Sequence, residues 1–187
     1  MERADRFDEL YRENYAAVVR YARRRADPDT ASDVVAETFL IAWRRLDFVP
    51  ADPAAAQPWL YGVARRVLAN IERSRRRADR VALRVGQHSR DEHVPDTAGS
   101  VAERARLAQA LAALSSSDHE VLRLIAWEEL DLAGAAIAMG CSRSTMTVRL
   151  HRARRRLEKA LGAIDNDEPG LALSQPALIQ RIRQETQ

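Results

Sequence analysis

Hydrophobic residues recur about every 3.6 positions along most of this 187-residue chain, and that interval is the period of an α-helix. Only seven glycines and seven prolines interrupt the pattern, so long stretches remain available for helix. Apolar residues make up 46% of the chain and charged residues 30%, which is ordinary for a folded, helix-rich protein. The sequence therefore predicts an all-α fold.

Helix-breaking residues set the predicted boundaries of the helices. Residues 27–29 end the first helix, and Thr30 is predicted to cap the second as the first residue of a capping box. Residues 48–57 include two prolines and are predicted as a loop, which places Pro58 in the first turn of the third helix. A second capping box at residues 117–120 predicts the start of another helix.

The composition of residues 85–103 differs from that of the rest of the chain. This segment holds Gly, Pro, Ser and four acidic residues against one Arg, with weak periodicity, and is predicted to be a flexible linker. It separates a predicted first helical domain, residues 1–84, from a second, residues 104–162. Residues 163–187 are predicted to form a C-terminal tail, to which the sequence assigns no role.

The aromatic residues concentrate in the first half of the chain. Nine of the ten lie at or before Tyr61, and only Trp127 lies after it. One interpretation is that the first domain has the larger aromatic core. The other is that some of these rings stack on unpaired nucleic-acid bases.

Residues 132–154 have the spacing of a helix-turn-helix, with a tight turn at Gly140 and a cap at Ser142. The predicted packing stripe of the second helix consists of Met146, Leu150, Ala153 and Leu157. An adjacent face is predicted to point outward and consists of Thr147, Val148, His151 and Arg152. No acidic residue lies between Asp131 and Glu158, although six arginines do. A merely solvated helix would mix its charges, so this pattern favours DNA binding in the major groove.

A second basic cluster follows the aromatic residues Trp59 and Tyr61. Its members are Arg65, Arg66, Arg73, Arg75, Arg76, Arg77, Arg80 and Arg84. Phosphate contact combined with base stacking is one interpretation, and a solvated basic face is the other. Of the 30 basic residues Lys159 is the only lysine, so 29 are arginine, which binds phosphate and guanine bidentately. A coding sequence rich in G and C would produce the same bias.

Catalytic and metal-binding patterns are weak in this sequence. Asp29, Asp33 and Glu37 are spaced four apart, as in a magnesium site, but capping and the helix dipole explain carboxylates at a helix N-terminus. The four histidines lack metal-like spacing, and a single cysteine, Cys141, excludes an internal disulfide. We therefore expect no enzyme activity and no cofactor or metal.

The chain shows no pattern of membrane insertion or export. Residues 169–180, an uncharged run as long as any in the chain, are far fewer than the roughly 20 residues of a membrane span. The N-terminus alternates charged and apolar residues, unlike a signal peptide. We therefore expect a cytoplasmic protein.

Two blocks of the sequence together resemble a known family. Asp33-Val-Val-Ala-Glu-Thr-Phe-Leu-Ile-Ala-Trp43, followed by Trp59-Leu-Tyr-Gly-Val-Ala-Arg65, resembles the polymerase-binding and −10-reading domain of extracytoplasmic-function (ECF) sigma factors. Residues 114–157, ending Arg149-Leu-His-Arg-Ala-Arg-Arg-Arg-Leu157, resemble the −35-reading domain of that family. The resemblance covers about residues 6–162, with both blocks in the family's order.

The resemblance implies a factor that binds core RNA polymerase, directs it to promoters and opens the −10 element, under the control of an anti-sigma factor. The residues implied to meet the polymerase are Asp33, Glu37, Thr38 and Trp43. Those implied to bind −10 DNA are Phe48, in a loop that captures a flipped base, and Arg65, Arg66, Asn70 and Arg73. The implied readers of the −35 bases are Thr147, Val148, His151 and Arg152. Contacts to DNA phosphates are expected from Arg143, Ser144, Thr145, Arg149, Arg154 and Arg155.

The chain departs from the family's usual residues at several positions. Ala36 stands where the family usually has Gln, Arg66 where it has Asn, Asn70 where it has Asp, Gly134 where it has Glu, and Ser144 where it has Gly. The alternative to a sigma factor is a helix-turn-helix regulator that acts without entering polymerase. That alternative accounts for the second block of the resemblance and leaves the first unexplained.

Overall fold

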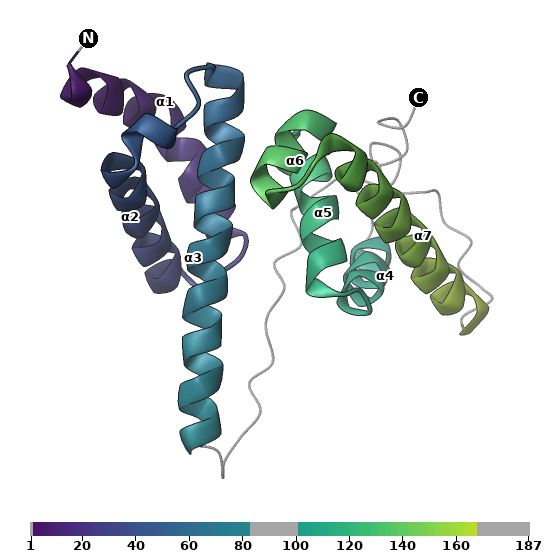
Figure 1. Ribbon diagram of the computed structural model, residues 1–187. Coiled ribbons are helices and arrows are strands. Elements are labelled where there is room, and N and C mark those ends of the chain that lie inside the picture. Colours follow the sequence, from purple (N-terminus) through teal and green to yellow (C-terminus); the bar gives the residue numbers. More distant parts are fainter. Residues whose placement is uncertain (1, 83–100, 168–187) are drawn as a thin grey trace. The chain divides into compact units, whose positions relative to one another are not determined.

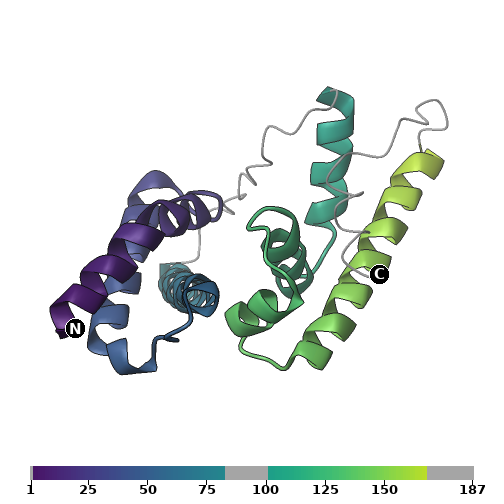
Figure 2. The ribbon, with the colours of Figure 1, turned by 90° about the horizontal axis from the view of Figure 1, so that it is seen from above.

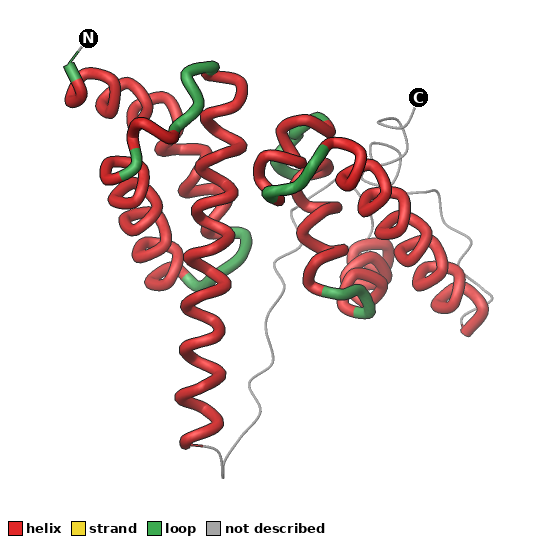
Figure 3. The backbone as a smooth tube through the Cα atoms, viewed as in Figure 1, coloured by secondary structure: helices red, strands yellow, loops and turns green. Residues whose placement is uncertain are grey.

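The computed structural model describes residues 2–82 and 101–167, which fall into two compact helical units. All regular structure in these residues is helical, as Figure 3 shows, and the prediction of an all-α fold with two helical domains is confirmed. Most of the predicted linker and tail lies outside the described residues. Residues 101–103, predicted as linker, are instead the start of a helix, and residues 163–167, predicted as tail, continue one.

The first unit is built from three α-helices that all contact one another: α1 (Arg3–Arg23), α2 (Pro28–Arg44) and α3 (Pro53–Ala82). A short 3-10 helix, η1 (Leu46–Phe48), connects α2 to α3. Figure 2 looks nearly along α3, with α1 and α2 together on one side of it. The C-terminal part of α3 extends past both partners in Figure 1, and residues 73–78 are exposed.

The core of the first unit includes three aromatic rings. Tyr21 and Tyr61 stack with their centroids 4.7 Å apart, and Phe39 is buried beside Tyr11. Other rings remain exposed in part, among them Tyr15. The aromatic residues of this half of the chain therefore supply both core and surface.

The helix starts in the first unit differ from those predicted. Asp27, not Thr30, is the N-cap of α2: its carboxylate accepts a hydrogen bond from the Thr30 backbone N–H at 2.9 Å, and proline occupies the first helical position. Helix α3 begins at Pro53, where the Asp52 carboxylate accepts from the Ala54 N–H at 3.0 Å. Pro58 is therefore inside α3, and the loop predicted at residues 48–57 is shorter than expected.

The second unit contains α4 (Val101–Ala112), α5 (Ser116–Ala126), α6 (Leu132–Met139) and α7 (Arg143–Asp167), and α7 contacts the other three. The predicted packing stripe of α7 is confirmed, and all its members are buried: Met146, Leu150, Ala153 and Leu157. Helix α7 contacts α5, whose buried residues include Leu124 and Ile125. The N-cap of α5 is Ser115, two residues before the predicted one.

Helices α6 and α7 form the predicted helix-turn-helix. Gly140 ends α6 in the left-handed conformation (φ 64°, ψ 42°), which glycine adopts without a steric penalty. The Ser142 hydroxyl oxygen then accepts from the Thr145 N–H at 3.1 Å and caps α7. At the other end of α6, the Asp131 carboxylate accepts from the Gly134 N–H at 2.7 Å. Both ends of the short helix are thereby fixed.

Candidate nucleic-acid and polymerase interface

The outward face of α7 has the composition of a base-reading surface. Thr147, Val148, His151 and Arg152 are all exposed, on the side of the helix away from the buried stripe. The Thr147 hydroxyl donates to the Arg143 carbonyl at 3.0 Å, and this bond fixes its rotamer. The face combines two small groups able to contact thymine methyls with two side chains able to bond base edges.

The N-terminus of α7 offers a phosphate-binding surface beside that face. Arg143, Ser144 and Thr145 are exposed in its first turn, where backbone N–H groups and the positive end of the helix dipole favour an anion. Arg149 is half-buried and Arg155 exposed farther along.

Two arginines near the end of this basic run are bound to the protein itself. Arg154 is only 8% exposed, so its predicted phosphate contact is wrong. It follows Leu150 by four residues and therefore lies on the packing side of the helix. Arg156 forms an ion pair with Asp118, which also accepts a hydrogen bond from the Ser115 hydroxyl at 2.6 Å. Arg156 thus connects α7 to the start of α5.

The basic run of α3 includes exposed and internally bonded residues. Arg66, Asn70 and Arg73 are exposed, Arg65 is half-buried, and Arg73 donates to the Asn70 side-chain oxygen one turn away. These four side chains extend over two turns of one helix, so they form a polar strip that can follow a nucleic-acid backbone.

Arg75 connects this run to the start of α2. Its guanidinium donates to the Thr30 hydroxyl oxygen at 2.5 Å and lies 3.6 Å from the Asp27 carboxylate. The Thr30 backbone N–H and then the Thr30 hydroxyl donate to Asp27, and these bonds, with a smaller effect of Arg75, hold the pKa of Asp27 below its ordinary value.

The α2 surface implied to meet the polymerase is acidic with exposed apolar groups. Asp33 and Glu37 are exposed one turn apart, and Leu40 and Trp43 are about 40% exposed beyond them. Thr38 is fully buried, and its hydroxyl donates to the Val34 carbonyl at 2.6 Å. A direct contact of Thr38 with a partner is therefore wrong, because this side chain faces the core of the first unit.

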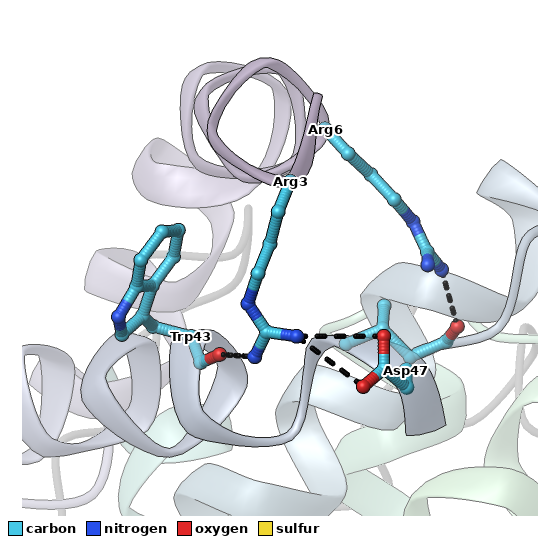
Figure 4. A network of polar contacts seen from close by, with 5 residues as sticks. Arg3, Arg6, Trp43 and Asp47 are labelled. Atoms are coloured by element: carbon cyan, nitrogen blue, oxygen red, sulfur yellow. Dashed lines mark hydrogen bonds and ion pairs between the residues drawn. The ribbon is translucent and has the colours of Figure 1, made fainter. Parts of the chain in front are cut away.

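Phe48 is the most exposed large apolar residue of the described chain, at 75%. Its neighbours Leu46 and Val49 are buried, so the ring projects from an anchored segment. Figure 4 shows two arginines of α1, Arg3 and Arg6, bonded to the residues around it. Sequence analysis did not single out these arginines, because their partners are 40 or more positions away and no local pattern connects them.

The residues that the structure describes contain neither a metal-binding cluster nor a membrane-spanning helix. Within residues 2–82 and 101–167, no group of three or more His, Cys, Asp or Glu side chains is arranged to hold a metal ion. None of the helices described is both long and apolar enough to span a membrane.

Comparison with known families and proteins agrees with this geometry. The family model described as Sigma-70 region 2 matches residues 10–84, and the one described as Sigma-70, region 4 matches residues 104–157. The chain is 32% identical over 153 residues to the ECF RNA polymerase sigma factor SigL of Mycobacterium tuberculosis, covering 81% of this chain and 86% of SigL.

Solved structures of sigma factors are similar as well. RpoE of Bartonella quintana, solved with the anti-sigma factor NepR, matches with a TM-score of 0.63 and 26% identity over 83% of this chain and 96% of that one. CnrH, a sigma factor known from Cupriavidus metallidurans and solved with the cytosolic domain of CnrY, matches with a TM-score of 0.56 and 28% identity, covering 84% and 88%. With both sigma regions present in order, the chain belongs to the ECF sigma factor family and directs RNA polymerase to promoters.

Proposed function

We propose that this sigma factor recognises its promoters with two separate surfaces. Thr147, Val148, His151 and Arg152 of α7 read the −35 element in the major groove. Phe48 and the polar strip of α3 bind the −10 element as a single strand. The observation that carries the proposal is that each unit exposes a surface of the matching chemistry: polar and methyl groups on a capped helix in the second unit, and an exposed ring and a strip of arginines in the first.

The −35 surface is completed by phosphate contacts. Arg143, Ser144 and Thr145 at the start of α7 fix the register of the helix on the duplex, and Arg149 and Arg155 hold the backbone farther along. Arg154 is not part of this set, since it is buried.

Polymerase binding is assigned to the exposed side of α2. Asp33 and Glu37 present two carboxylates one turn apart, and Leu40 and Trp43 add apolar area that a partner would bury. The polymerase surface that complements this side of α2 is therefore expected to be basic with an apolar centre. We assign polymerase binding and recognition of the −10 element to residues 1–84, and recognition of the −35 element to residues 104–162.

We further propose that an anti-sigma factor controls this chain in the cytoplasm, where RNA polymerase acts. RpoE, which has a similar fold, was solved with an anti-sigma factor, and CnrH, also similar in fold, was solved with the cytosolic domain of CnrY. The factor is proposed to have no catalytic activity of its own. A helix-turn-helix regulator acting without polymerase is not favoured, because the Sigma-70 region 2 match covers the half of the chain which that alternative leaves unexplained.

Run-off transcription with core RNA polymerase and a library of promoter sequences tests the proposal. We expect transcripts only when the factor is added, and we expect the selected promoters to share two conserved elements at a fixed separation. Binding of the free factor to the same DNA without any polymerase-dependent transcript would contradict the proposal and favour the regulator.

A further inference from the structure

We infer that Arg3 and Arg6, in the first turns of α1, are positioning residues that hold Phe48 exposed for stacking on an unpaired base. The inference rests on the proposed function, in which the Phe48 segment binds the −10 strand. It adds a role for α1 in promoter opening, although neither arginine is proposed to contact DNA.

Arg3 is bonded to both sides of the junction between α2 and η1. One guanidinium nitrogen donates to the Trp43 carbonyl at 2.7 Å, and the other lies 3.2 Å from a carboxylate oxygen of Asp47 (Figure 4). The Trp43 carbonyl belongs to the last turn of α2, where carbonyls lack a partner within the helix. The guanidinium also lies over the Trp43 ring, 5.5 Å from its centroid.

Arg6 holds the other side of Phe48. It donates to the Val49 carbonyl at 2.7 Å, in a partly buried position. Val49 is itself buried, and its backbone N–H donates to the Leu46 carbonyl at 3.1 Å. The residues before and after Phe48 are therefore each bonded to α1, one through a side chain and the other through a carbonyl.

The consequence for Phe48 is a fixed backbone under an exposed ring. A free loop would turn an aromatic side chain inward to reduce its exposed apolar area. Here Leu46 and Val49 take the inward positions and the arginines hold the chain between them, so the Phe48 ring remains in solvent. A ring held in this way loses little conformational freedom when a base stacks on it, which favours binding.

The Arg3–Asp47 ion pair does not suit a purely stabilising role. The side chains of Arg3 and Asp47 are 46% and 80% exposed, and ion pairs so exposed contribute little to the stability of a fold. Their effect is expected to be local, because every one of these bonds ends on a residue within five positions of Phe48.

Holoenzyme binding to single-stranded −10 DNA tests the inference. The oligonucleotide carries the −10 sequence selected in transcription, and an abasic site replaces each base in turn. We expect one position where the abasic site weakens wild-type binding by roughly 5- to 100-fold, the range of a lost base–aromatic stack. In Phe48→Ala this penalty should fall at least about fivefold, the low end of that range. It should fall similarly in Arg3→Ala/Arg6→Ala, and combining all three changes should lower it no further.

The matched control is Arg12→Ala/Arg20→Ala, which removes two exposed arginines from the same helix. It should leave the penalty at its wild-type value. Arg3→Lys, which keeps the charge but loses the two-pronged geometry, serves as a milder variant if the double change disturbs α1. General misfolding would weaken both assembly with polymerase and binding to every oligonucleotide. Loss of positioning would instead change the abasic-site penalty at one position only.

A spectroscopic measurement follows Phe48 without DNA. The chain has three phenylalanines, so fluorophenylalanine labelling gives three 19F resonances, and Phe48→Leu assigns the relevant one. We expect that resonance to shift in Arg3→Ala/Arg6→Ala and not in the control. An unchanged Phe48 resonance would overturn the inference.

The DNA results separate two kinds of failure. If Phe48→Ala abolishes the penalty but the Arg3 and Arg6 variant keeps it, the inference is overturned and the proposed function stands. If Phe48→Ala keeps the penalty, the proposed base contact is itself overturned, and the inference with it.

Discussion

Arg152 and Arg155 lie three residues apart on α7, both exposed, yet we expect their substitution to have different effects. Arg152 belongs to the reading face and can bond guanine O6 and N7 together, so Arg152→Ala should cost about 1–3 kcal/mol of discrimination at one or two −35 positions. Arg155→Ala should weaken all promoters alike and lower the salt slope by about one unit. Affinities for single-base −35 variants over a salt series check this. Equal weakening of every variant by Arg152→Ala would mean that the reading face is wrongly assigned.

A second residue-scale prediction concerns Asp27, whose pKa is lowered chiefly by the hydrogen bonds from Thr30. A carboxyl whose pKa is lower in the folded state stabilises the fold above its unfolded pKa and loses that effect as pH falls through the folded one. The wild type should therefore be more stable than Asp27→Asn at pH 7, and the difference should vanish in acid below the ordinary value of 3.8. Urea unfolding of both proteins across this range measures the difference. A difference independent of pH would contradict the assignment.

Single residues also show where sequence reasoning reached its limit. The burial of Arg154 follows from its position one turn after Leu150, so the helical period alone would have removed it from the DNA contacts. Thr38 follows Val34 in the same way and donates to its carbonyl. The helical period does not indicate the contacts of Arg3 and Arg6, since they depend on how α1 packs across the end of α2.

At the scale of elements, the sequence predicted which helices exist more accurately than where they begin. The helix-turn-helix was predicted correctly because Gly140 and Ser142 are separated by a single residue and each has a distinct role. The predicted starts of α2 and α5 differ from the observed ones because several neighbouring residues are all good N-caps, and tertiary packing selects among them. Competition among equal local signals therefore limits such predictions.

Helix α7 offers a test of element stability. Gly162 lies inside it, and a Cβ added there would have no atom within 4 Å apart from its own helix and neighbours. Gly162→Ala should therefore stabilise the second unit by about 0.5–1 kcal/mol, because alanine loses less backbone entropy in a helix. The reverse change at the next, exposed position, Ala163→Gly, should destabilise by a similar amount. Thermal unfolding of both variants measures the effect, and no change in either would indicate that the helix is frayed there.

At the scale of the whole molecule, the proposed function divides promoter recognition between the two units, one for each form of DNA. The second unit presents a rigid, capped helix suited to an intact duplex, and the first presents a ring and a basic strip suited to a separated strand. The first unit also exposes the carboxylates of Asp33 and Glu37 on α2, which repel DNA and suit a protein partner. In the proposed function, charge therefore separates the surface for polymerase from the surfaces for the promoter.

The assembly with polymerase provides the last prediction. Asp33 and Glu37 are exposed one turn apart on α2, so Asp33→Lys/Glu37→Lys reverses the charge of the proposed polymerase surface without touching the core. Exposed charge changes usually alter stability by within about 0.5 kcal/mol, so the variant should fold normally while its affinity for core RNA polymerase falls. Glu9→Lys/Glu13→Lys is the matched control, with the same charge change and spacing on exposed positions of α1. Titration of labelled factor into core polymerase at two salt concentrations should show weaker binding for the α2 variant only, with the gap narrowing at high salt. Wild-type affinity in the α2 variant would show that polymerase binds elsewhere. Equal weakening in both variants would show that the change in net charge, and not the α2 surface, lowers the affinity.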